Sequence, residues 1–201
     1  MSSSPVHPIL IDTSGLIAAA NTKLWPEVCD NLKLTTTNVC EHELTRHVRD
    51  KNEYAPEDSR EYQLHHGSQK TLDVMDEEDV PITTVNCVPR PHGSDAGEES
   101  LRRQLSQDPD PYSLVILMDA DGRRSIRRTI QSQNESIPVV GPPYLFYLLK
   151  DKGIINRQEF CEACGEMIDN EGWTGYKAVK AAWEGIPVDC SDCLDDRLLP
   201  P

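Results

Sequence analysis

The sequence predicts one α/β domain, with a mostly parallel central sheet flanked by helices in three layers, and a small C-terminal helical extension. Short strand-like runs alternate with helical segments along most of the chain, which is typical of parallel sheets with right-handed crossovers. The length of 201 residues suits one domain plus a small appendage. The chain has neither an internal repeat nor a low-complexity tract that would favour another architecture.

Each predicted strand is a short apolar or β-branched run that ends at a polar or turn-forming residue. The five runs cover residues 9–11, 32–37, 80–88, 112–119 and 137–141. Each predicted helix begins close to a capping residue or a proline. The helical segments begin after Asp12, Asn38, Pro56, Asp95, Asp121 and Gly141. Two further helices are expected at residues 157–173 and 175–185, before an irregular tail.

The chain is strongly acidic, with a net charge of −14 and a pI near 4.8. Such a surface repels nucleic acid, so a nucleic-acid role needs a local basic patch or bridging metal ions. It also suits a salt-rich cytoplasm, where ions screen the self-repulsion. No apolar run approaches the length of a membrane span, and "MSSSPVHP" lacks the features of a signal peptide. We therefore expect a soluble, cytoplasmic protein with no membrane partner.

Acidic residues recur where predicted strands give way to helices. They are Asp12, Glu43 (with Glu41 as the alternative), Asp95 and Glu98, and Asp119 and Asp121. If the strands are parallel, these positions meet at one edge of the sheet. Several carboxylates in one cleft repel each other unless a cation neutralises them, and hard oxygen ligands suit Mg²⁺ or Mn²⁺.

Each acid also has a structural interpretation. Asp12 could cap the following helix together with Thr13 and Ser14. Asp95 and Glu98 have the spacing of a capping box, and Asp119 could end a strand in a turn. Glu41 and Glu43 could be solvated helix residues. The recurrence of acids at four crossovers favours the metal-site interpretation over these alternatives.

Five motifs occur in the order "LIDTSGLIA", "CEHEL", "DAGEESL", "LMDADGRR" and "IPVVGPPYLFYLLKDKGII". In this order they resemble a PIN domain of the archaeal toxin-type or stand-alone branch, over roughly Ile9 to Ile155. We therefore predict a PIN-like nuclease domain at residues 1–155 and a helical extension at residues 156–201. The resemblance implies a metal-dependent ribonuclease in which four acids bind one or two divalent ions and a water attacks the RNA phosphate.

Carried over to this chain, the resemblance makes Asp12 the first acid and Glu43 the second. The third acid is either Asp95 or Glu98, since family branches use either position. The fourth is either Asp119 or Asp121. The family often has Thr-Asp-Asp before the glycine, whereas this chain has Asp119-Ala120-Asp121, so the identity of the fourth ligand stays open.

Four arginines follow Asp121 closely and are candidate RNA-phosphate contacts: Arg123, Arg124, Arg127 and Arg128. Spacings of three and four residues place the last three on one helical face. Arg102 and Arg103 are candidates to extend this basic surface. The alternative is a solvated helix face that neutralises an acidic surface.

Two cysteine pairs lie in the predicted extension: Cys161 and Cys164, and Cys190 and Cys193. Four thiolates in paired Cys-x-x-Cys motifs can bind tetrahedral Zn²⁺. The alternative is free thiols in a reducing compartment, which also suits the odd total of seven cysteines.

The sequence thus predicts an endoribonuclease that uses Mg²⁺ or Mn²⁺ and acts on RNA. A toxin of a toxin–antitoxin pair, with an antitoxin partner and a homodimeric state, follows from family analogy alone. The main alternative is a catalytically degenerate domain that serves as a protein-interaction or scaffold module. A phosphatase or DNA nuclease built on the same acids is a third hypothesis.

Overall fold

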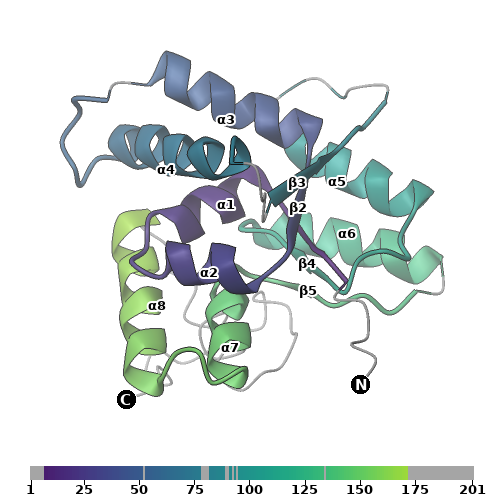
Figure 1. Cartoon of the computed structure of the whole chain (residues 1–201). Coiled ribbons are helices and arrows are strands. Elements are labelled where there is room, and N and C mark those ends of the chain that lie inside the picture. The colour runs from purple at the N-terminus through teal and green to yellow at the C-terminus, as the bar shows by residue number, and fades with distance from the viewer. Residues whose placement is uncertain are drawn as a thin grey trace.

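A computed structural model describes residues 7–51, 53–77, 82–88, 91, 93, 95–133 and 135–171. Five strands form one sheet in the order β3-β2-β1-β4-β5, and every neighbouring pair is parallel. The strands are β1 (Ile9–Ile11), β2 (Leu34–Thr37), β3 (Ile82–Val85), β4 (Leu114–Ile116) and β5 (Val139–Val140). The predicted parallel α/β fold is confirmed (Figure 1).

The described part of the chain contains eight helices around this sheet. They are α1 (Thr13–Ala20), α2 (Trp25–Asn31), α3 (Asn38–Asp50), α4 (Arg60–Met75), α5 (Ala96–Gln107), α6 (Ala120–Ser132), α7 (Pro143–Asp151) and α8 (Arg157–Glu171). Where the sequence predicted one helix from Asp12 towards Trp25, the chain forms α1 and α2 with a short turn between them.

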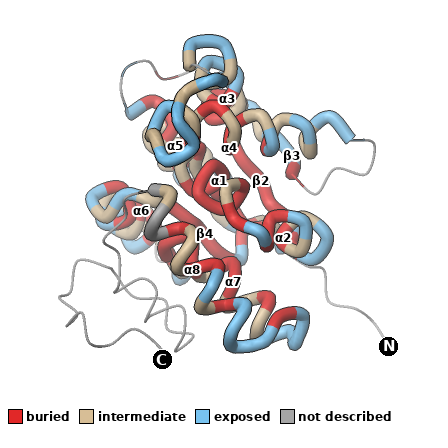
Figure 2. Tube along the Cα trace, turned by 90° about the vertical axis from the view of Figure 1, so that its left-hand side faces the viewer, coloured by how far each residue is buried: buried red, intermediate tan, exposed pale blue. Residues whose placement is uncertain are grey.

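The two faces of the sheet carry separate hydrophobic clusters, because successive strand residues point to opposite sides. On β1, Ile9 and Ile11 pack into a cluster with α1, α2, α7 and α8. Leu10 points the other way and packs with residues of α5 and α6. Figure 2 shows the buried strands between these helical layers, and all three β1 residues are buried. The sheet is therefore the middle of three layers.

Helix α8 packs into the main core of the domain. Its residues Phe160, Cys164 and Met167 are each no more than 2% exposed and belong to the same cluster as Leu145 and Phe146 of α7. The predicted boundary at residue 155 stays a prediction, since most of the predicted extension lies outside the described residues.

The strand order determines where a ligand site can form. The chain runs outward from β1 to β2 and β3, then returns to place β4 on the other side of β1. The loops that leave β1 and β4 at their carboxyl ends run in opposite directions, which makes this position the topological switch point of the sheet. Open α/β sheets bind ligands in the crevice that forms there. Asp12 directly follows β1, and Asp119 follows β4 by three residues.

No helix in the described ranges has the length and apolarity to span a bilayer.

Candidate metal centre

A cleft of about 200 Å³ opens at the switch point of the sheet. Its lining residues are mostly acidic or small: Asp12, Thr13, Ser14, Glu43, Asp95, Gly97, Glu98 and Asp119. Within the described part of the chain, five carboxylates from four separate segments therefore share one cleft. Glu41, the alternative to Glu43, is not among the residues that line it.

Asp12 lines the cleft from the junction between β1 and α1. Its Oδ1 accepts a hydrogen bond from Gly15 N at 2.7 Å, and its Oδ2 accepts one from Met118 N at 3.3 Å. Burial raises the pKa of Asp12 to about 7, and the nearby carboxylate of Glu43 adds to this rise. The two backbone donors and the charge of Arg123 act in the opposite direction. Asp12 caps α1 and also faces the cleft, so the two interpretations of its role are compatible.

Glu43, in the second turn of α3, is held by two donors from other elements. Thr13 Oγ1 donates to Glu43 Oε2 at 2.6 Å, and Gly97 N donates to Oε1 at 3.2 Å. Helix α3 is itself capped by Thr37, whose side chain accepts from Cys40 N. The predicted cap, Asn38, instead accepts a hydrogen bond from Cys87 N. Glu43 therefore links α1, α3 and α5 and also lines the cleft.

The other three carboxylates have fewer partners. Asp119 caps α6 and accepts from Gly122 N at 2.7 Å. Asp95 is exposed and makes no side-chain capping bond at the start of α5, so the predicted capping box is absent. Burial raises the pKa of Glu98, and the charges of Asp119 and Asp95 add to the rise, while a hydrogen bond with Ser125 opposes it. Asp119 and Asp95 are therefore each close enough to Glu98 to repel its charge.

Three glycines make room for three of these carboxylates. A Cβ atom at Gly15 would lie 2.7 Å from Asp12 Oδ1, and one at Gly97 would lie 2.7 Å from Glu43 Oε2. A Cβ at Gly122 would lie 2.7 Å from Glu98 Oε2. Real Cβ atoms do not approach other heavy atoms this closely, so any side chain at these positions would displace the carboxylate.

The chemistry of the cleft fits a hard divalent cation. Among the described residues, all the charged groups that line it are carboxylates, the ligands that Mg²⁺ and Mn²⁺ prefer. Burial raises the pKa of Asp12 more than its hydrogen bonds and the charge of Arg123 lower it, so a bound cation would favour its charged form. Within the described ranges, however, no three acidic, histidine or cysteine side chains are close enough to enclose an ion. Metal binding would therefore require the carboxylates to move closer together.

Asp121, a candidate metal ligand, and Arg123, a candidate RNA contact, do not lie where these roles require. Asp121 has an 81% exposed side chain that pairs with Arg124, and it does not line the cleft. Arg123 is only 1% exposed and donates hydrogen bonds to the carbonyl oxygens of Leu117 and Met118. The prediction that Arg123 contacts RNA is therefore wrong, because its guanidinium is enclosed by its own chain.

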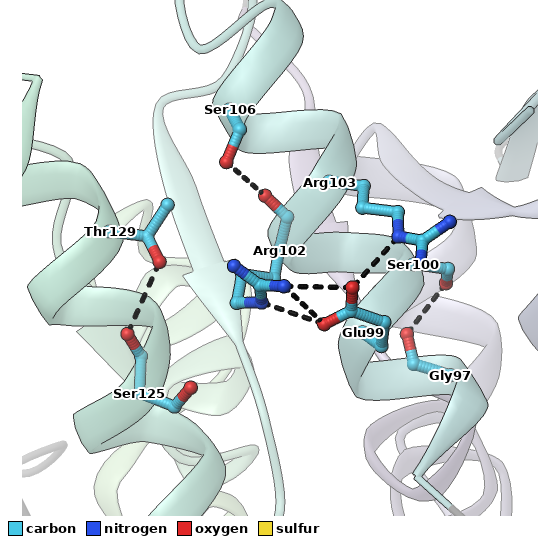
Figure 3. Close-up of polar contacts among 8 residues, drawn as sticks. All are labelled: Gly97, Glu99, Ser100, Arg102, Arg103, Ser106, Ser125 and Thr129. Carbon is cyan, nitrogen blue, oxygen red and sulfur yellow. Dashed lines mark hydrogen bonds and ion pairs between the residues drawn. The ribbon is translucent and has the colours of Figure 1, made fainter. Parts of the chain in front are cut away.

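The remaining arginines of α6 are more accessible. Arg124 and Arg128 are exposed, whereas Arg127 is partly buried and donates to the carbonyl oxygen of Val139. On α5, Arg102 and Arg103 both turn towards Glu99 on the same helix (Figure 3). The exposed arginines of α6 are therefore Arg124 and Arg128.

The structure describes only half of the predicted zinc site, because Cys190 and Cys193 lie outside the described residues. Cys164 is buried in the core, and burial raises the pKa of its thiol well above the usual value. Cys161 is partly exposed. The burial of Cys164 disfavours the thiolate form that zinc binds. The zinc site stays a prediction.

Local sequence patterns give no role to Gly97 and only a capping role to Thr13, although both donate hydrogen bonds to Glu43. Thr13 directly follows Asp12, and Gly97 directly precedes Glu98, so each lies next to a predicted ligand. That adjacency was a usable signal. The hydrogen bonds themselves span 30 and 54 residues of sequence and could not be derived from local patterns.

The parallel sheet, with acids gathered at its carboxyl edge, has the arrangement expected of a PIN-like α/β domain. The sequence matches the family model described as Halobacterial PIN domain over residues 1–200. The chain therefore belongs to the halobacterial PIN domain family. Neither curated proteins nor solved structures gave a match. PIN domains are generally nucleases that use divalent metal ions and bind RNA.

Proposed function

We propose that this protein is a divalent-metal-dependent endoribonuclease whose metal centre is the acidic cleft. The observation that carries the proposal is the gathering of Asp12, Glu43, Asp95, Glu98 and Asp119 at the switch point of the sheet. A divalent ion bound there would supply an activated water and polarise the scissile phosphodiester.

The residues of the chain would divide the remaining work. Asp12 and Glu43 would serve as ligands whose orientation is fixed in advance by backbone and hydroxyl donors. Glu98 and Asp119, with Asp95 at the rim, would complete the ligand set. Of the two candidates for the fourth acid, Asp119 is favoured because it lines the cleft, whereas Asp121 is paired with Arg124 outside it. Arg124, Arg127 and Arg128 would contact phosphates of the bound strand.

The test is cleavage of an RNA panel by the full chain with Mg²⁺ or Mn²⁺, at high and low KCl. We expect Asp12→Asn to reduce cleavage by at least about 10²-fold, because even the loss of a group that only orients a metal ligand costs 10–100-fold. Asp30 is an exposed acid on α2, so Asp30→Asn is the matched control and should cleave RNA at the wild-type rate. Full activity of Asp12→Asn would overturn the proposal. Single-stranded DNA and a phosphomonoester in the same panel test the other hydrolase hypotheses.

A second candidate function is a catalytically degenerate domain that acts as a protein-interaction module. The separation of the carboxylates within the described residues favours it. It predicts no cleavage and no Mn²⁺ binding by the wild-type chain. The toxin role, an antitoxin partner and a homodimer rest on the family resemblance alone. Growth arrest on expression of the wild-type chain, but not of Asp12→Asn, would support a toxin.

A further inference from the structure

Arg123 is the least expected charged residue of the molecule. It is 1% exposed and ranks among the largest fully buried side chains. None of the ion pairs found in the described ranges involves it, and its buried Nε has no hydrogen-bond partner. Burying a charged group without an ion pair is costly, so its presence requires an explanation.

The guanidinium of Arg123 contacts two successive carbonyl groups behind the cleft. Its Nη1 donates to the oxygen of Leu117 at 2.5 Å and to the oxygen of Met118 at 2.6 Å. These carbonyls belong to the segment that joins β4 to α6. The contacts fix the orientation of both peptide groups that flank Met118.

The first of these peptide groups leads directly to Asp12. The peptide group between Leu117 and Met118 accepts from Arg123 at its oxygen, and its N–H donates to Asp12 Oδ2 at 3.3 Å. Hydrogen bonds in such a chain polarise one another, so a cationic donor on the carbonyl makes the N–H a stronger donor. Arg123 thus acts on Asp12 through one peptide group, across 111 residues of sequence.

The second peptide group leads to Asp119. Its carbonyl is that of Met118, and its nitrogen is the backbone nitrogen of Asp119. Asp119 then caps α6 through its side chain. A single buried guanidinium therefore holds the backbone that places one carboxylate and orients the donor to another.

We propose that Arg123 is a positioning residue for the metal centre, holding Asp12 and Asp119 in place through the peptide groups on either side of Met118. This inference rests on the proposed function, since it assumes that these carboxylates bind a divalent ion. In a merely structural role, Arg123 would donate hydrogen bonds to two buried carbonyls without affecting the carboxylates of Asp12 and Asp119.

The test is Mn²⁺ affinity, measured by titration calorimetry well below the unfolding temperature, for the wild type, Arg123→Lys and Arg123→Met. Lysine keeps the charge but lacks the planar array of donors. We expect the affinity to fall by about tenfold or more in Arg123→Lys and further in Arg123→Met. Arg49→Met, which removes an exposed arginine of α3, is the matched control and should bind Mn²⁺ like the wild type. The amide NMR signal of Met118 should shift in Arg123→Lys and not in Arg49→Met.

Wild-type Mn²⁺ affinity in Arg123→Lys would overturn the inference, even if its unfolding temperature fell, because that combination is the signature of a structural role alone. If Arg123→Met does not fold, Arg123→Lys decides. A wild-type chain that binds no Mn²⁺ also overturns the inference. If the wild type binds Mn²⁺ but cleaves no RNA, the proposed function fails, and the comparison of affinities still decides the role of Arg123.

Discussion

Two groups of carboxylates share the acidic cleft: Asp12 and Glu43 have both carboxylate oxygens hydrogen-bonded, whereas Asp95, Glu98 and Asp119 have fewer bonds. The first group is held by donors from α1, α5 and the segment after β4. In the second group, Asp95 makes no capping bond and Glu98 relies on Ser125. The difference indicates one group that is pre-organised and one that must adjust when an ion binds.

This difference also accounts for the carboxylates being gathered without enclosing an ion. Ligands that are already fixed in place lower the free-energy cost of ordering a metal site. Only the remaining carboxylates then have to move when the ion binds. Burial raises the pKa of Glu98, and the charges of Asp119 and Asp95 add to the rise; this repulsion of Glu98 by its two neighbours opposes closer approach of the carboxylates in the metal-free protein. A divalent cation bound between these carboxylates would attract them all and outweigh their repulsion.

The largest effect should come from filling the space beside Glu43. Gly97→Ala places a Cβ 2.7 Å from Glu43 Oε2, so the carboxylate must move, and a displacement of about 1 Å at an active site can cost about 10²-fold in rate. RNA cleavage and Mn²⁺ titration measure the loss. Gly165→Ala, where an added Cβ meets nothing within 4 Å, is the control and should keep both properties. Equal behaviour of the two variants would mean that Glu43 needs no fixed position.

A smaller effect is expected when a single hydroxyl that bonds one carboxylate of each group is removed. Thr13→Val deletes a donor to Glu43 and should weaken Mn²⁺ binding about tenfold. Ser125→Ala deletes the hydroxyl that hydrogen-bonds Glu98 in the less constrained group and should weaken binding less. Calorimetric affinities of the two variants compare the two groups directly. A larger loss in Ser125→Ala would contradict the assignment of Asp12 and Glu43 as the pre-organised group.

The smallest expected effect is a gradual change of stability and of Mn²⁺ affinity with pH. Because the pKa of Asp12 is raised from 3.8 to about 7, the metal-free fold favours its neutral form. The contribution of Asp12 to stability is therefore greatest below pH 4 and is lost as the pH rises from 4 to 7. Mn²⁺ competes with that proton, so its apparent affinity should fall by at most about tenfold per unit below pH 7.

Calorimetry in buffers of different ionisation enthalpy measures this proton release. We expect the wild type to release a proton near pH 6.5 on binding Mn²⁺, because Asp12 is then mostly protonated in the metal-free form. A variant with Asp12→Asn has no such proton to release. Binding by the wild type without any proton release would show that Asp12 is already ionised.

The sequence by itself determined the alternation of strands and helices, the class of fold and the candidate acids. Those properties depend on local patterns: short buried runs such as Ile9–Ile11 and a capping residue such as Asp12 can be recognised from neighbouring positions. The sequence also left the choice between Asp119 and Asp121 open, because both follow β4 within one helical turn and only their orientation separates them.

Only the tertiary structure decided that Asp119 faces the cleft while Asp121 faces solvent, and that Arg123 is buried rather than presented to RNA. It also decided which groups hold the ligands, since Thr13 meets Glu43 and Met118 meets Asp12 across 30 and 106 residues. The physical reason is that a residue's type limits the bonds it can make, whereas the packing of distant segments selects its partner and its exposure.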